Sequence, residues 1–345
     1  KEIDDSADVV MVIAHAGPTS EYSEADAANS ILSVEGVDLL QCGHSHSTYI
    51  NNDGPIPVGE VKNGAGEVLK YTVTLDKDKK ITSATVETVS VKDQTPDEGV
   101  RAVEAVKTVH EKAVEYVSGN VLGHASAKFQ PENEIAGIPQ GKLEDTAVMD
   151  LINTVQLKYA QADVSAAALF KDTSDLPEGE LNYGNIFDIY KYDNTLYRVN
   201  ITGEQLKQYM EWSASHYNTW TEGDINISFN KSIPGYRYDM FAGVDYEIDL
   251  SKPAGERIVN VMYKGEPLKD DEQLKLAVNN YRFSSAVKAM VGGDEAKEWE
   301  SSQSIRDMLV EYLAENDPLV PTVDNNWKIV GVDLSVDDPR RQEII

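Results

Sequence analysis

Two short apolar runs near the start of the chain, residues 9–14 and 36–40, have the length and composition of buried β-strands. Residues 23–33 between them read as a helix. A strand, a helix and a second strand in this order form a βαβ unit, whose strands lie parallel in one sheet. The start of the chain is therefore restricted to an α/β architecture.

Each of these runs ends in a loop that contains glycine and histidine. His15 follows the first run, and His44 and His46 follow the second. Ligands of open α/β sheets bind beyond the carboxyl ends of the strands, and neutral imidazole is the commonest side-chain metal ligand. A single histidine here would more often be structural. Because residues i and i+2 of a strand share a face, we expect the three to bind one ion or two adjacent ions.

Three imidazoles do not complete a hydrolytic site. Two-metal phosphoester hydrolases hold their ions about 3.5–4 Å apart, which needs bridging carboxylates. The nearby Glu21, Glu24 and Asp26 open the predicted helix, where their expected role is to favour its dipole. We expect the bridging carboxylates and all catalytic residues to lie upstream of Lys1, in a longer protein from which this chain is a piece.

The charge balance limits the partners. The chain has 59 acidic and 31 Lys or Arg residues, a net charge of −28, which argues against nucleic-acid duplexes and anionic membranes. A phosphate-bearing ligand would need a metal or a local basic group. The single cysteine, Cys42, excludes an intrachain disulfide and is expected to be a small buried hydrophobe. No apolar run is long enough to span a membrane.

The length of 345 residues suggests two domains. We predict a first domain over residues 1–95, ending in antiparallel strands at 69–75 and 81–91, and a linker helix over 96–119. A second α/β domain covers 120–332, with helices at 146–159, from Thr202 to about 215 and at 302–316, and a last strand at 327–332. Thr202 and Gln205 fit a capping box. The charged tail, 333–345, is expected to be unstructured or loosely packed.

The second domain contains tyrosine-rich segments, at residues 190–195, 236–246 and 279–282. Tyrosine rings can hold a nucleobase, and stacking contributes about 1–3 kcal/mol per base. For any single tyrosine, packing of an amphipathic strand is the more ordinary interpretation.

The first histidine motifs resemble those of the calcineurin-like metallophosphoesterases. The matching segments are residues 15–17, His-Ala-Gly, and residues 43–46, Gly-His-Ser-His. The resemblance implies that His15 and His44 bind one metal and that His46 binds the other. The bridging aspartate, the asparagine ligand and the catalytic histidine of that superfamily have no counterpart here and would precede Lys1.

The tyrosine segments are similar to the C-terminal domain of the 5′-nucleotidase family, above all to its 2′,3′-cyclic-nucleotide 2′-phosphodiesterase/3′-nucleotidase branch. The resemblance implies that Tyr192 and Tyr281 clamp the base, with Asn194 beside it. Members specific for 5′-nucleotides carry an arginine motif where this chain has residues 165–171, Ser-Ala-Ala-Ala-Leu-Phe-Lys. The Gly-Gly-Asp of those members is also absent at the equivalent distance.

The resemblance implies a mixed α/β (α+β) fold, namely the C-terminal part of a metallophosphoesterase sandwich, a linker helix with a hinge, and a nucleotide-binding domain. It implies hydrolysis of nucleotide phosphoesters with two divalent ions, among which Mn, Zn, Fe, Mg and Ca are not distinguished. The alternatives are a 5′-nucleotidase or nucleotide-sugar hydrolase, and a nucleoside-binding module without catalysis. We expect a monomer, an extracytoplasmic location, and poor activity from this chain by itself.

Overall fold

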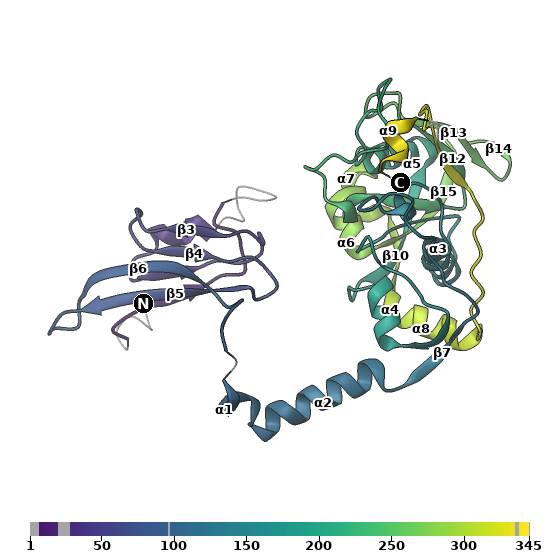
Figure 1. Cartoon of the computed structure of the whole chain (residues 1–345). Helices are drawn as coiled ribbons and strands as arrows, with labels where there is room; N and C mark the ends of the chain where they lie inside the picture. Colours follow the sequence, from purple (N-terminus) through teal and green to yellow (C-terminus); the bar gives the residue numbers. More distant parts are fainter. Residues whose placement is uncertain (1–6, 20–27, 96, 335–337, 345) are drawn as a thin grey trace. The chain divides into compact units, whose positions relative to one another are not determined.

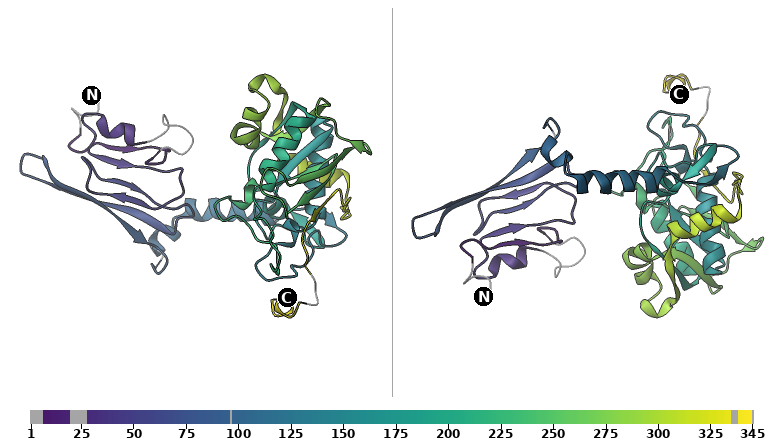
Figure 2. Two further views of the ribbon diagram at one scale, coloured as in Figure 1. Left: turned by 90° about the horizontal axis from the view of Figure 1, so that it is seen from above. Right: turned by 90° about the horizontal axis from the view of Figure 1, so that it is seen from below.

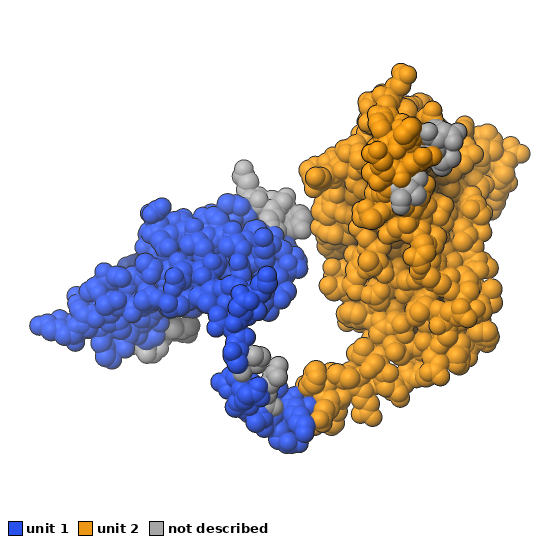
Figure 3. All heavy atoms as spheres, viewed as in Figure 1, with its two compact units in different colours: residues 1–107 blue, residues 108–345 orange. Residues whose placement is uncertain are grey.

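The computed structural model describes residues 7–19, 28–95, 97–334 and 338–344. The chain divides into two compact units, Lys1–Lys107 and Thr108–Ile345 (Figure 3). The division falls inside the predicted linker segment, which contains two helices instead of one: α1 (Glu98–Arg101) and α2 (Glu104–Ser118). The helix α1 begins at the cap Asp97 and ends at Ala102. The boundaries that we predict for the domains, residues 1–95, 96–119, 120–332 and 333–345, stay predictions.

Unit 1 contains a four-stranded sheet in the order β1-β2-β4-β3 (Figure 1). Its strands are β1 (Met11–Ile13), β2 (Leu39–Gln41), β3 (Tyr49–Asn51) and β4 (Val58–Glu60). The pairs β1–β2 and β2–β4 are parallel, as the βαβ pattern predicts, and β3–β4 is antiparallel. In the described part of the connection a 3-10 helix, Ala28–Ser33, replaces the predicted helix. Glu21, Glu24 and Asp26 lie outside the described residues.

The first predicted strand is not buried. Among the described residues β1 pairs only with β2, and the side chain of Ile13 is 72% exposed. The small core of unit 1 therefore lies on the other strands, around Leu40, Cys42 and Val58.

A long hairpin, β5 (Glu67–Leu75) and β6 (Ile81–Ser90), packs beside this sheet, as Figure 2 shows. The hydroxyl of Tyr71 donates a hydrogen bond of 2.7 Å to the carbonyl of Leu40. A Cβ at Gly59 would lie 2.9 Å from Leu69 Cδ2, so the glycine lets the side chains of the hairpin pack closely on β4.

Unit 2 is built on a five-stranded sheet in the order β11-β8-β15-β10-β16, with β8 and β15 parallel and the other pairs antiparallel. A second sheet has the order β14-β13-β12-β17, and β7 pairs with β9. The strands are β7 (Val121–Ala125), β8 (Val164–Ala168), β9 (Gly179–Asn182), β10 (Thr195–Thr202), β11 (Asp239–Ala242), β12 (Asp245–Asp249), β13 (Ile258–Tyr263), β14 (Glu266–Pro267), β15 (Gln273–Asn279), β16 (Lys297–Ser304) and β17 (Trp327–Val330).

The main helices of unit 2 pack against these strands and close one large core. They are α3 (Ala147–Ala160), α4 (Tyr183–Ile189), α5 (Gly203–Ala214) and α8 (Ile305–Glu315); shorter helices are α6 (Asn280–Arg282) and α7 (Lys288–Met290). The predicted capping box of α5 is present: Gln205 N donates to Thr202 Oγ1 and Thr202 N donates to Gln205 Oε1. The predicted mixed α/β class is confirmed.

The prediction of a loosely packed tail is wrong for residues 338–344. A short helix, α9 (Pro339–Gln342), holds Arg341 with its side chain 4% exposed. The guanidinium donates to the carbonyl of Ile225 and forms an ion pair with Glu134, both at 2.7 Å. One buried arginine thus anchors a segment that has little apolar surface of its own. Among the described residues, no helix has both the length and the apolar character needed to cross a membrane.

Candidate functional site

The histidine loops meet at the carboxyl edge of the sheet in unit 1. Because Ile13 pairs with Gln41, the residues that follow β1 and β2 leave the sheet side by side. Nε2 of His15 lies 3.2 Å from Nδ1 of His44, and the ring centroids are 5.1 Å apart. Both side chains and that of His46 are exposed.

The spacing of the His15 and His44 nitrogens suits a shared metal ion. Two nitrogens, each about 2.0–2.1 Å from a tetrahedral ion, lie roughly 3.3 Å apart. The separation of 3.2 Å is close to this value. Within the described part of the chain, however, no cluster of three potential ligand atoms includes these histidines. The described residues therefore supply imidazoles without a carboxylate ligand.

His44 and His46 do not lie on a strand, so the prediction that strand alternation gives them a common face is wrong. The strand β2 ends at Gln41, and both histidines have left-handed backbone conformations, with φ of 82° and 54°. Such conformations cost free energy in residues other than glycine and cluster at ligand sites. The loop itself, not strand alternation, sets the direction of these side chains.

The end of the third parallel strand contributes a residue that sequence reasoning missed. Glu60 ends β4, beside Cys42, whose N–H donates to the carbonyl of Gly59. Glu60 is 1% exposed, and neither carboxylate oxygen has a hydrogen-bond partner among the described residues. Burial, and secondarily the charge of Glu60, raise the pKa of Cys42 to about 11, so the thiol packs as a neutral buried group. Extending the strand-end argument to β4 would have found Glu60.

The second predicted site lies at one end of the large sheet in unit 2. Leu196, at the start of β10, pairs with Asn279, at the end of β15. This register brings the segment that carries Tyr192 and Asn194 to the same end of the sheet as Tyr281. The side chains of Tyr192 and Tyr281 are 48% and 46% exposed, which is unusual for large aromatic residues in a packed domain.

Two further aromatic residues join them. The ring of Phe170 packs edge-on against Tyr192, with the centroids 5.1 Å apart. Tyr236 is 42% exposed, and its pKa is raised by burial and then by the neighbouring Tyr281 and Tyr192 hydroxyls. We call Phe170, Tyr192, Tyr236 and Tyr281 the aromatic cluster.

A buried ionic network supports the aromatic cluster. Nε of Arg282 lies 2.5 Å from Oδ2 of Asp239, and the Tyr209 hydroxyl donates to the same oxygen at 2.7 Å. The guanidinium of Arg282 also donates to the carbonyl of Tyr236 at 2.5 Å and lies over the ring of Trp212. The network therefore links the backbone of Tyr236 to the residue that follows Tyr281.

Asn194 lies beside Tyr190, which is completely buried. Burial raises the pKa of Tyr190, and the side-chain amides of Asn194 and Asn279 oppose that shift. The side chain of Asn194 is thus half-buried and close to the Tyr190 hydroxyl.

An acidic cluster lies elsewhere in unit 2. The carboxylates of Asp145, Asp150 and Asp324 come within 4.8 Å of one another. Burial, followed by the neighbouring carboxylates, raises the pKa of Asp145 to about 7, and burial is also the main cause that raises the pKa of Asp150 to about 6. The sequence gives little indication of this cluster, because Asp324 is far along the chain from Asp145 and Asp150.

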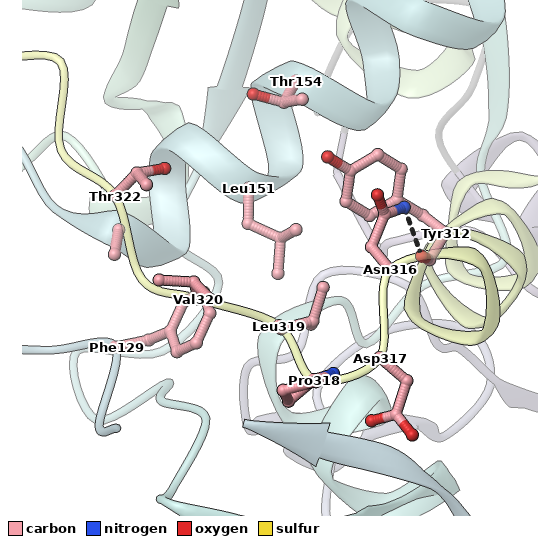
Figure 4. A pocket seen from close by; sticks show the side chains of 11 residues that line it. Phe129, Leu151, Thr154, Tyr312, Asn316, Asp317, Pro318, Leu319, Val320 and Thr322 are labelled. Atoms are coloured by element: carbon pink, nitrogen blue, oxygen red, sulfur yellow. Dashed lines mark hydrogen bonds between the residues drawn. The ribbon is translucent and has the colours of Figure 1, made fainter. Parts of the chain in front are cut away.

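A hollow of about 470 Å³ opens between α3 and the segment after α8 (Figure 4). The figure shows the side chains of Leu151, Leu319 and Val320 along it, and its only charged lining residue is Asp317. A lining with one carboxylate and no cationic side chain does not suit an anionic ligand.

Comparison with known proteins places these sites in context. The model of the family "5′-nucleotidase, C-terminal domain" matches residues 121–291. The 2′,3′-cyclic-nucleotide 2′-phosphodiesterase/3′-nucleotidase of Haemophilus influenzae is 27% identical over 94% of this chain and 58% of its own length. The trifunctional nucleotide phosphoesterase protein YfkN of Bacillus subtilis is 24% identical over 95% of this chain and 26% of its own length.

Solved structures share the fold. A putative 5′-nucleotidase from Staphylococcus aureus aligns with a TM-score of 0.73 at 18% identity, over 95% of this chain and 65% of that one. A 5′-nucleotidase precursor from Thermus thermophilus aligns with a TM-score of 0.52 at 18% identity, over 87% of this chain and 61% of that one. The chain thus spans between about a quarter and three fifths of these two curated relatives.

Proposed function

Because residues 121–291 belong to the 5′-nucleotidase C-terminal domain family, we propose that the protein carrying this chain hydrolyses nucleotide phosphoesters with the help of divalent metal ions. The observation that carries the proposal is the exposed aromatic cluster at one end of the unit 2 sheet. Tyr192 and Tyr281 bind the two faces of the base, and Asn194 lies beside it. Stacking on such rings tolerates different bases, because every base has a π-face.

The finer assignment is a 2′,3′-cyclic-nucleotide 2′-phosphodiesterase/3′-nucleotidase. The names of relatives from Haemophilus influenzae, Yersinia enterocolitica and Salmonella typhimurium support it. The strand β8 supports it as well, because its buried Ser-Ala-Ala-Ala run carries no arginine for a 5′-phosphate. Ser165 instead donates to Asn153 Oδ1 and accepts from Gln156 Nε2, both at 2.8 Å.

The metal centre of this proposal uses His15 and His44 for one divalent ion and His46 for a second. Bound divalent ions neutralise phosphate charge and lower the pKa of a coordinated water. The spacing of the His15 and His44 nitrogens supports the first assignment.

A location outside the cytoplasm belongs to the same proposal. It is supported by the Thermus thermophilus neighbour, which is a 5′-nucleotidase precursor. The ligand is a small nucleotide or nucleoside, since the strongly acidic chain repels nucleic-acid duplexes.

The test compares 2′,3′-cyclic AMP, 3′-AMP and 5′-AMP as substrates of the full-length protein, with Mn²⁺ and after chelation. The proposal predicts metal-dependent turnover of the first two in preference to 5′-AMP. Preference for 5′-AMP would favour a 5′-nucleotidase or nucleotide-sugar hydrolase.

A second candidate concerns this chain by itself. The described histidines lack a clustered carboxylate, which favours a chain that binds nucleosides without efficient turnover. Adenosine binding by calorimetry, together with the absence of turnover by the 345-residue chain, would support this candidate. Turnover by that chain at the rate of the full-length protein would contradict it.

A further inference from the structure

A hollow of about 480 Å³ in unit 2 lies directly beside the aromatic cluster. Phe170 and Tyr236 belong to both, so the hollow shares a wall with the proposed base site. Its charged lining residues are Lys142, Lys171, Lys231 and Asp172. We call this hollow the lysine pocket.

The charge of the lysine pocket is opposite to that of the chain. Three lysines and one aspartate line it, whereas the whole chain has a net charge of −28. The hollow beside Leu151 has a similar volume and a single acidic lining residue. A local positive potential in an acidic protein attracts an anionic ligand and directs it to this pocket.

Lys142 is the buried cation of the pocket. Its side chain is 5% exposed, and Nζ lies 2.5 Å from Oδ1 of Asp172 and 5.5 Å from the centre of the Phe229 ring. An ammonium group has three donors, and among the described residues one ion pair uses it. Lysines are almost never this buried unless they are paired, because desolvating the charge is costly, and Asp172 supplies that pair.

The backbone around Lys142 is shaped to admit its ammonium group. A Cβ on Gly235 would lie 2.5 Å from Lys142 Nζ, closer than real contacts allow. Glycine at position 235 therefore leaves the space into which the lysine reaches, beside the residue that precedes Tyr236.

His216 also lines the pocket and is packed among aromatic rings. Its ring stacks between Phe229 and Tyr238, with centroids 5.0 Å and 5.8 Å away, and Nδ1 lies 3.2 Å from the carbonyl of Ile233. Burial, and then the nearby charge of Lys142, lower the pKa of His216 to about 4. His216 therefore adds no positive charge to the pocket at neutral pH.

Two more cations lie nearer the mouth. Lys231 is exposed and forms no ion pair with any residue that the structure describes, whereas Lys171 pairs with Asp188. A ligand phosphate that reaches Lys142 would thus meet a second cation, Lys231, that has no competing carboxylate.

We propose that the lysine pocket binds a second phosphate of the nucleotide, so that the substrates include nucleoside bisphosphates. The inference rests on the proposed function, because it requires the base to lie against Tyr192 and Tyr281. The ribose phosphate that is not hydrolysed enters between Lys142 and Lys231. The shared residues Phe170 and Tyr236 line the path from base to phosphate.

Calorimetry with the 345-residue chain in EDTA tests the inference without any metal–phosphate contact. The probes are adenosine, 3′-AMP, adenosine 3′,5′-bisphosphate and inorganic phosphate. We expect the bisphosphate to bind roughly tenfold more tightly than 3′-AMP. This is the gain in affinity expected from one charge-assisted hydrogen bond between the second phosphate and a lysine of the pocket. Lys231→Gln and Lys142→Met should each reduce that gain and leave adenosine affinity unchanged, whereas the control Lys328→Gln should change neither.

If Lys142→Met does not fold, Gly235→Ala replaces it, because the added methyl group displaces Nζ. Equal affinity for 3′-AMP and the bisphosphate would overturn the lysine pocket while adenosine binding still supported the base site. Failure to bind adenosine would overturn the base site. In that case, binding of inorganic phosphate that is lost in Lys231→Gln would still support the lysine pocket as an anion site. If inorganic phosphate does not bind either, the lysine pocket is overturned together with the base site.

Discussion

The guanidinium of Arg282 forms a buried ion pair with Asp239, with 2.5 Å between Nε and Oδ2 and both side chains at most 5% exposed. The same guanidinium donates to the carbonyl of Tyr236, and Tyr281 is the preceding residue. The position of the exposed tyrosines is therefore tied to an ion pair in the domain core.

Replacing Arg282 with methionine should destabilise unit 2 strongly. The change leaves Asp239 buried without its cation, which typically costs about 3–5 kcal/mol. Urea unfolding monitored by fluorescence measures the loss. The double variant Asp239→Asn/Arg282→Met should recover a large part of it, and a double variant as unstable as Arg282→Met alone would contradict the explanation.

Removing one ring of the aromatic cluster should weaken nucleoside binding. Tyr192→Ala is expected to lose about 1–3 kcal/mol of adenosine binding, while Tyr192→Phe keeps the stacking surface and most of the affinity. Tyr116→Ala is a matched control, because this tyrosine of α2 is 61% exposed and packs on Tyr183. Calorimetry that finds the same affinity in Tyr192→Ala and wild type would exclude the ring from the site.

The buried acidic cluster should make unit 2 less stable as the pH rises. Asp145 and Asp150 titrate near pH 7 and 6 in the folded chain, well above their unfolded values near 4. The folded state then binds more protons between about pH 4 and 7, so the free energy of unfolding falls across that window.

Asp145→Asn isolates this effect. His216 has a lowered pKa and contributes the opposite slope between about pH 4 and 6.5, so the comparison must be variant against wild type. The variant should unfold at higher denaturant than wild type at pH 8, with the advantage shrinking toward pH 4. An advantage that is independent of pH would show that removal of the charge is not the cause.

The histidine loops should bind a divalent ion through His15 and His44. Loss of a residue that only holds a metal ligand in place lowers the affinity for the metal about 10–100-fold. Loss of a ligand itself, in His15→Ala or His44→Ala, should therefore lower that affinity at least roughly tenfold. His110→Ala, an exposed histidine on α2, is the control. Zn²⁺ or Mn²⁺ titration in which all three variants match wild type would contradict this assignment.

Features that depend on strand order were predictable from the sequence, and features that depend on long-range packing were not. The parallel pairing of β1 and β2 follows from the βαβ pattern and explains why His15 and His44 meet. The backbone of Tyr236 is held instead by a hydrogen bond from Arg282, 46 residues away. No local pattern in the sequence announces that contact.

The same distinction holds at other positions. Asp324 joins Asp145 and Asp150 through backbone contacts across more than 170 residues, since the Asp324 N–H donates to Asp150. Arg341 anchors the charged tail through its ion pair with Glu134, although the composition of the tail predicts a loosely packed segment. Glu60 was missed because no motif marks it, although its strand-end position follows from the same topology as the histidines.

A crystal structure of the 345-residue chain with bound 3′-AMP would locate the base site. We expect the base between the rings of Tyr192 and Tyr281, with Asn194 within hydrogen-bonding distance of it. A base bound elsewhere, for example in the hollow beside Leu151, would overturn the proposed base site.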